Sequence, residues 1–201
     1  MARPPDDELP SPADIEACRR CPLWERATHG VAGEGTRRAR ILLVGEQPGD
    51  EEDRQGRPFV GPAGKLLRRA LADAVIASAD VFVTNAVKHF DWEPRGTRRI
   101  HKTPGQRAIA ACHDWLEREI GAVRPRVIVA LGGTALAALL GRGHKVGESR
   151  QRDDLLHHTG ARVVATYHPS AVLRAIDDAS RAELYGALVA DLARAASWAS
   201  A

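Results

Sequence analysis

Hydrophobic positions along the chain occur in two alternating patterns. Short uninterrupted apolar runs, rich in valine and isoleucine, are typical of strands that are buried on both faces of a sheet. Between them, apolar residues recur three and four positions apart, which predicts helices. Strands that alternate with helices predict an α/β fold, here a three-layer α/β/α sandwich with a central four-stranded parallel sheet.

The predicted strands cover residues 41–44, 81–87, 126–131 and 162–166. The predicted helices cover 64–76, with a start near Pro62, and 104–120, 134–140, 171–176 and 180–196. Residues 91–103 are rich in charge and predict a loop, and the simplest interpretation of the acidic run at 50–53 is a solvated loop. Proline and aspartate mark residues 1–11, which we expect to be a disordered tail, so that residues 12–201 form one domain.

With 201 residues and a hydrophobic content of 44%, the chain is long enough to bury the core of one globular domain. It has no apolar run of membrane-spanning length and no apolar signal segment after Met1. We therefore expect a cytoplasmic protein that is a monomer and has no membrane partner.

The net charge of +3 is small, but the positive side chains are unevenly spread. One basic cluster lies in and after the predicted loop, and its members are Arg95, Arg98, Arg99, Lys102 and Arg107. Local basic patches are typical of phosphate binding, so this cluster favours a nucleic-acid partner. A second cluster, formed by Arg37, Arg38 and Arg40, is equally well explained as a solvated surface.

Polar side chains follow three of the predicted strands. Glu46 and Gln47 come after the first strand, Asn85 lies near the end of the second, and His168 follows the fourth. His101 lies in the charged loop after the second strand. The carboxyl ends of parallel strands share one edge of a sheet, where the ligands of open α/β folds bind. Each residue alone has a structural explanation, but together they predict a catalytic site.

Two longer stretches carry a family resemblance. Residues 41–64 read ILLVGEQPGDEEDRQGRPFVGPAG, and residues 168–174 read HPSAVLR. The first stretch resembles the first motif of the uracil-DNA glycosylase superfamily, in the branch of family 4 and its UdgX relatives. The second stretch resembles the second motif of the superfamily. The similarity covers almost the whole chain from Cys18 onward, and it implies excision of uracil from DNA.

The resemblance suggests a role for each candidate side chain. The Asn85 amide can accept a hydrogen bond from uracil N3–H and donate one to O4, whereas cytosine reverses both positions. Phe59 can stack on the base, an interaction worth about 1–3 kcal/mol. His168 can donate to the uracil oxygen on which negative charge grows. Glu46 can stabilise the oxocarbenium ion of the sugar.

The same resemblance implies a wider set of contacts, in the two motifs and in the basic loop. We expect the base pocket to include Gly45, Gln47, Gly61 and Ser170. We expect DNA to be held by Arg98, Arg99, Lys102 and Arg174.

Residues 98–104, RRIHKTP, resemble the KRRIH loop of UdgX, with Thr97 in place of the first lysine. In UdgX the loop histidine attacks the anomeric carbon and leaves the protein covalently joined to DNA, a role that falls on His101 here. Neutral imidazole is a suitable nucleophile. Once its other proton is lost, to Glu46 in this scheme, the N-alkyl imidazole is a poor leaving group. The implied partner is uracil-containing DNA, preferably single-stranded.

Two other functions fit the same residues. An ordinary turnover glycosylase would use Glu46 and Gln47 to position a water molecule. A non-catalytic iron–sulfur module would bind DNA without releasing uracil.

The cysteines are Cys18, Cys21 and Cys112, and an odd number argues against a disulfide framework in an intracellular chain. A CxxC pair with a distant third cysteine is instead typical of a metal site. Family 4 has a cysteine after the lysine of the second strand, where this chain has His89. The resemblance therefore implies a [4Fe-4S] cluster on Cys18, Cys21, His89 and Cys112. His113 is a rival fourth ligand, and zinc is the alternative metal.

Overall fold

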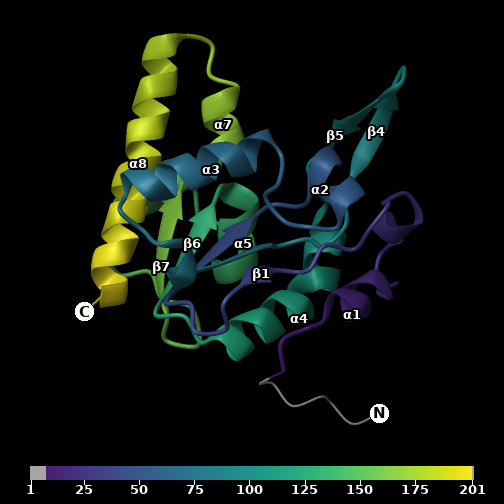
Figure 1. Ribbon diagram of the computed structural model, residues 1–201, viewed down its shortest axis with the longest axis horizontal. Coiled ribbons are helices and arrows are strands. Elements are labelled where there is room, and N and C mark those ends of the chain that lie inside the picture. Colours follow the sequence, from purple (N-terminus) through teal and green to yellow (C-terminus); the bar gives the residue numbers. More distant parts are fainter. Residues whose placement is uncertain (1–7, 201) are drawn as a thin grey trace.

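The computed structural model describes residues 8–200 and contains a central sheet of five strands in the order β1-β3-β2-β6-β7 (Figure 1). The strands are β1 (Glu34–Gly35), β2 (Ile41–Gly45), β3 (Val81–Asn85), β6 (Val127–Leu131) and β7 (Arg162–Thr166). β2, β3, β6 and β7 are parallel, which confirms the predicted α/β fold with its four parallel strands. β1 pairs with β3 in the antiparallel sense and adds a short fifth strand at one edge.

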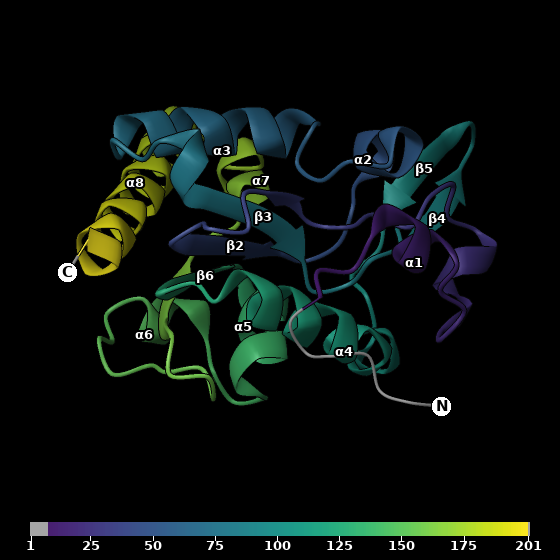
Figure 2. The same cartoon turned by 60° about the horizontal axis from the view of Figure 1, so that its bottom comes forward.

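Helices cover both faces of this sheet (Figure 2). On one face lie α3 (Pro62–Asp73), α7 (Pro169–Leu173) and α8 (Asp178–Ser200). On the other lie α4 (Gln106–Val123) and α5 (Gly133–Leu140). The short helices are α1 (Pro12–Glu16), α2 (Asp50–Gln55) and α6 (Val146–Ser149). Among residues 8–200, no helix has both the length and the apolar character to cross a membrane.

Alternation along the parallel strands divides the core into two halves. Leu42 and Val44 belong to the half that contains the buried residues of α4 and α5. Ile41 and Leu43 belong to the half that contains those of α3 and α8. Because side chains of a strand point alternately to its two faces and both faces are covered, most positions are apolar. This is why the strands are continuous hydrophobic runs in the sequence.

The charged segment at 91–103, predicted as a loop, contains a β-hairpin. β4 (Trp92–Arg95) pairs with β5 (Arg98–His101) around Gly96 and Thr97, and Gly96 has a φ of 59°. Glycine with positive φ suits the tight turns that join such strands. The prediction failed because charged side chains fill these strands, so the alternating apolar pattern is missing.

The acidic run at 50–53 is the first turn of α2 and not a solvated loop. Negative side chains stabilise that end of a helix, and Gly56 ends α2 with a φ of 67°. Glu52 is buried and accepts hydrogen bonds from the backbone N–H groups of Gly49 and Gly61, at 3.1 and 2.8 Å. This carboxylate therefore joins the start of α2 to the start of α3.

The structure describes the last four residues of the predicted N-terminal tail. Residues 1–7 of the predicted tail lie outside the described residues. Residues 8–11 are ordered, because Leu9 packs against the core and the Ser11 side chain caps α1. Further along, α4 begins at Gln106 with Gly105 as its N-cap, two residues later than predicted.

A buried ion pair joins the sheet to α4. Lys88, just after β3, donates from Nζ to the Glu119 carboxylate at 2.7 Å, and both side chains are almost completely buried. The same ammonium donates to the Thr84 hydroxyl and the Asn85 carbonyl. Glu119 in turn accepts from the Thr84 hydroxyl and from the Gly33 N–H. The network holds β3, α4 and the segment before β1 together.

We predict that Glu119→Gln lowers the free energy of unfolding by about 3–5 kcal/mol, because it leaves the Lys88 ammonium buried without a counter-charge. Urea unfolding measures the loss. The control is Glu148→Gln, which removes an exposed ion pair with Lys145 and should cost less than about 1 kcal/mol. Equal losses in the two variants would contradict the importance of the buried pair.

Candidate active site

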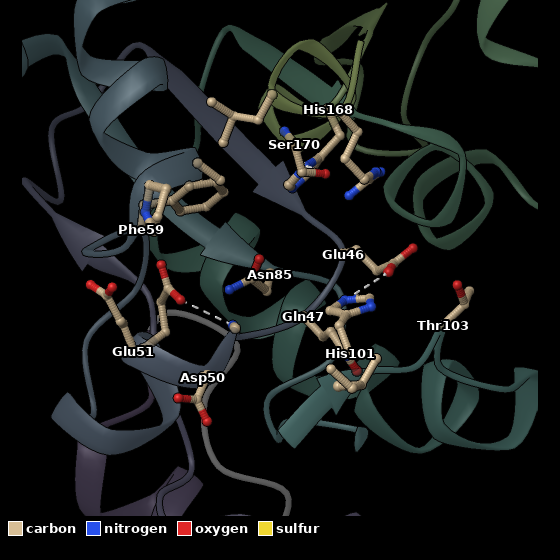
Figure 3. Close-up of a pocket in the computed structure, with 17 residues that line it drawn as sticks. Glu46, Gln47, Asp50, Glu51, Phe59, Asn85, His101, Thr103, His168 and Ser170 are labelled. Atoms are coloured by element: carbon tan, nitrogen blue, oxygen red, sulfur yellow. Dashed lines mark hydrogen bonds and ion pairs between the residues drawn. The ribbon is translucent and has the colours of Figure 1, made fainter. Parts of the chain in front are cut away.

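The parallel register brings the ends of β2 and β3 side by side, with Gly45 opposite Asn85. A pocket of about 710 Å³ lies beyond these strand ends, and Figure 3 shows the side chains around it. They come from both sequence motifs, from β3 and from the hairpin. Of the predicted site residues, the lining contains Glu46, Gln47, Phe59, Asn85, His101, His168, Ser170 and Arg174.

Asn85 and Phe59 approach each other over a glycine. A Cβ atom on Gly45 would lie 2.3 Å from Asn85 Oδ1 and 2.7 Å from a carbon of the Phe59 ring, so only glycine leaves room for both. Gly45 therefore leaves space for the Asn85 and Phe59 side chains that line the pocket, whereas Gly61 is the N-cap of α3 and is not part of the lining. The Asn85 side-chain amide has no hydrogen-bond partner within residues 8–200, which leaves both its oxygen and its nitrogen for a ligand.

His168 is the N-cap of α7, and its Nδ1 accepts a hydrogen bond from the Ser170 N–H at 3.1 Å. Because Nδ1 accepts, the proton of the neutral ring is on Nε2. Burial lowers the pKa of His168 to about 4, so the ring is neutral at physiological pH. Its centroid lies 6.4 Å from that of the Phe59 ring. His168 can therefore act as a neutral N–H donor next to the aromatic ring.

Glu46 and His101 face each other in the pocket (Figure 3). His101 Nε2 lies 3.2 Å from Glu46 Oε1, and the Thr134 hydroxyl donates to Glu46 Oε2. Burial raises the pKa of Glu46, but the hydrogen bonds from His101 and Thr134 outweigh that effect, and the net pKa is lowered. Glu46 is thus ionised at neutral pH. The His101 side chain is 46% exposed, so solvent and a large ligand can reach it.

The Gln47 amide holds the two ends of the hairpin. Its Nε2 donates to the carbonyl of Asp91 at 3.0 Å and to that of Lys102 at 3.1 Å. Its Oε1 accepts from the Asp91 N–H at 3.1 Å. Asp91 and Lys102 directly flank β4 and β5. The Gln47 amide thus fixes the hairpin that carries His101, and its predicted contact with the base stays a prediction.

Arg99 fixes the hairpin from its other side. Its guanidinium donates to the carboxylates of Asp50 and Asp53, both on α2, and its side chain is only 14% exposed. Arg99 is therefore paired inside the protein, and its predicted DNA contact stays a prediction. Arg98 and Lys102 are partly or fully exposed on the hairpin and its end, and Arg174 borders the pocket. Their DNA contacts stay predictions.

Sequence reasoning missed three residues that complete the site. Thr134 is in the first turn of α5, after β6, and its hydroxyl donates to Glu46, which follows β2; no local pattern marks it. Asp50 and Asp53 stand in the acidic run of the first motif, and their opposite charge to the basic loop was the one available signal.

The predicted metal ligands are all buried, and the cysteines are free thiols. Cys21 and Cys112 belong to one buried cluster, while Cys18 accepts a hydrogen bond from the Trp115 indole at 3.3 Å. His89 Nδ1 is buried and has no hydrogen-bond partner within the described part of the chain. Burial lowers the pKa of His89, which keeps the ring neutral and able to ligate.

The spacing of these ligands bears on the metal. No three of them have ligand atoms within 4.8 Å of one another in the described residues. A zinc ion bonds sulfur at about 2.3 Å, so its ligand atoms lie within about 4.6 Å of each other. The set as it stands is too open for one zinc ion, whereas a four-iron cube separates its ligands more widely. His113 is exposed and lies nearest to Glu117, which makes it the poorer fourth ligand.

An α/β sheet with a pocket at the carboxyl ends of its strands, lined by an amide, an aromatic ring, a neutral imidazole and a carboxylate, defines a nucleobase-binding class of protein. The chain belongs to the uracil-DNA glycosylase superfamily, whose profile matches residues 32–193.

Named relatives agree with this assignment. The chain is 40% identical over 166 residues to the type-4 uracil-DNA glycosylase of Pyrobaculum aerophilum, covering 80% of this chain and 81% of that protein. It is 42% identical over 161 residues to the type-4 enzyme of Thermotoga maritima, covering 80% of each. The type-5 uracil-DNA glycosylase of Pyrobaculum aerophilum is 30% identical over 171 residues, 78% of this chain and 72% of that protein.

The low pKa of His168 predicts a dependence of stability on pH. The ordinary pKa of about 6.5 applies to the unfolded chain, and the folded value is about 4. Between these values the proton binds mainly to the unfolded state. The contribution of neutral His168 to the free energy of unfolding is therefore fully present above about pH 6.5 and is lost as the pH drops towards 4. Urea unfolding at pH 7 and pH 5 should show a larger loss for wild type than for His168→Gln. Parallel losses would contradict the assignment.

Proposed function

We propose that this protein excises uracil from DNA and then becomes covalently attached to the abasic sugar through His101, as a UdgX-type glycosylase. The observation that carries the proposal is the position of His101, with Nε2 3.2 Å from Glu46 in the pocket that also contains Asn85, Phe59 and His168. The relatives that are named uracil-DNA glycosylases support the excision step.

Excision uses the inner part of the pocket. The flipped uracil stacks on Phe59, and the unpartnered Asn85 amide reads its N3–H and O4. As the glycosidic bond breaks, its electron pair moves to the base, and negative charge develops on the uracil oxygens. The neutral His168 Nε2–H donates to that charge, without a proton transfer being required. The Glu46 carboxylate faces the positive charge that develops on the sugar.

The covalent step involves the exposed side of the pocket, where His101 faces Glu46. A neutral His101 ring attacks the anomeric carbon through a nitrogen lone pair and forms a C–N bond. The attached ring is then cationic and loses its remaining N–H proton to an acceptor, for which Glu46 is the nearest carboxylate. The neutral alkyl imidazole that results is a poor leaving group, so the link to DNA persists.

A preference for single-stranded DNA fits this scheme, because no base pair has to be broken before uracil enters the pocket. We propose that Arg98, Lys102 and Arg174 contact the phosphates and that the protein acts as a monomer. Thr97, in place of the lysine of the UdgX loop, lies in the turn of the hairpin and away from the pocket lining.

We also propose that Cys18, Cys21, His89 and Cys112 hold a [4Fe-4S] cluster. The unpartnered His89 Nδ1 and the three buried thiols support it. When bound, the cluster would supply a crosslink between the N-terminal segment, the end of β3 and α4. Cys18 would have to turn from Trp115 towards the other thiols.

The covalent product is tested with a labelled single-stranded oligonucleotide that contains one uracil. We expect a protein–DNA band that survives SDS and heat. His101→Ser should lose this band but still release uracil, since the inner pocket is unchanged. Asn85→Ala is the control that should lose both, because it removes base recognition.

Other outcomes distinguish the remaining functions. A crosslink that persists in His101→Ser would show that the nucleophile is another residue. Uracil release by wild type without any crosslink would favour the turnover glycosylase in which Glu46 positions water. DNA binding without uracil release would favour a non-catalytic module.

The cluster is tested by the iron content and visible absorption of the purified protein. Cys112→Ser should lose both, because it removes one buried ligand. His113→Ala is the matched control and should retain both iron and visible absorption, since His113 is exposed and directly follows Cys112 on α4. If His113→Ala lost its iron while a His89→Ala variant kept it, the fourth ligand would be His113 and not His89.

A further inference from the structure

A second group of potential metal ligands lies far from the pocket. His157 and His158 lie in the turn before β7, and Glu117 is near the middle of α4. The pocket lies beyond the carboxyl ends of the strands, whereas this turn precedes the amino end of β7. The five residues of β7 span about 16 Å, so the group lies near the amino end of β7, whereas His168 follows its carboxyl end.

The three side chains converge on a small volume. His157 Nε2 lies 3.2 Å from Glu117 Oε1, and His158 Nε2 lies 2.6 Å from Glu117 Oε2. The two imidazole rings are 4.1 Å apart between centroids. One ligand atom from each residue lies within 4.8 Å of the others, and no other set of three or more ligand side chains in residues 8–200 is so compact.

The group is held in place before any ion binds. The His157 side chain is completely buried, and its Nδ1 lies 2.9 Å from the Thr159 hydroxyl. A second partner of this kind orients a ligating histidine and leaves Nε2 for the metal. The turn itself is closed by the His157 N–H, which donates to the Ala161 carbonyl, and by Gly160 with a φ of 88°.

We propose that Glu117, His157 and His158 form a binding site for a divalent transition-metal ion of the zinc class. Two imidazoles and a carboxylate are a ligand set that zinc uses, with bonds of about 2.0–2.2 Å. Such bonds require ligand atoms within about 4.4 Å of each other, which the observed contacts allow with only small shifts. His113 lies one helical turn before Glu117, with Nε2 3.9 Å from its carboxylate, and can supply a fourth ligand.

The alternative is a simple ion pair between Glu117 and the histidines. The Glu117 carboxylate is half-buried, and its hydrogen bonds to His157 and His158 outweigh the effect of burial and lower its pKa. That pairing holds the three groups together in the metal-free protein. An ion would bind Nε2 of each ring in the tautomer that carries its proton on Nδ1, with any second ring proton released to solvent, and it would join α4 to the turn before β7.

The test is a calorimetric titration of the purified protein, with its iron retained, with zinc chloride. We expect one zinc ion per chain and a melting temperature that rises with zinc concentration. His158→Ala removes an exposed ligand and should weaken binding by more than the about 10–100-fold that loss of an orienting partner costs. Glu117→Gln should weaken it similarly. His144→Ala, a histidine of the α5–α6 loop, is the matched control and should bind as wild type does.

Uracil release and iron content should be unchanged in His158→Ala, because neither the pocket nor the cysteines contain this residue. Zinc binding of equal strength in wild type and in both ligand variants would overturn the proposal, since the ion would then lie elsewhere. A wild type whose melting temperature does not respond to zinc would overturn it as well.

Discussion

The site depends on how a two-stranded ribbon is held against the sheet. An isolated hairpin is at best marginally stable in water, so β4 and β5 cannot position His101 by themselves. Gln47 supplies the anchor at the base of the ribbon, with three hydrogen bonds to its flanking backbone. Arg99 supplies a second anchor through two carboxylates of α2. Since Gln47 adjoins Glu46 in the sequence, the same turn presents the carboxylate and fixes the histidine that faces it.

The charge states of the pocket residues and of the buried Lys88–Glu119 pair follow from their surroundings. His168 is neutral because burial lowers its pKa, and Glu46 is ionised because His101 and Thr134 stabilise its charge. Below the pocket, the Lys88 ammonium and the Glu119 carboxylate are buried as a pair, and the ammonium donates to the Asn85 carbonyl. Burying one charge without the other is costly. The pair therefore fixes the backbone that presents the Asn85 amide.

Particular residues show how far sequence reasoning reached. Four parallel strands were predicted from their apolar runs, and Glu46, Asn85 and His168 were assigned to one edge because parallel strands end together. The hairpin was missed because its strands carry charged side chains and protrude from the core, where no apolar pattern is required. Likewise, Asp53 looked solvated by composition, yet it is buried because Arg99 and two backbone N–H groups satisfy it.

By itself, the sequence determined the four parallel strands with the main helices between them, the family and the residue types at the strand ends. These follow from local periodicity and from motifs whose members are close along the chain. Only the tertiary structure decided that Gln47 and Arg99 support the hairpin and that Thr134 reaches Glu46. Those assignments rest on contacts between residues 44 to 88 positions apart, such as Gln47 with Asp91 and Thr134 with Glu46. A polar side chain such as that of Gln47 or Arg99 has several possible partners in the sequence. Which one it binds depends on the residues that the folded chain places within hydrogen-bond distance.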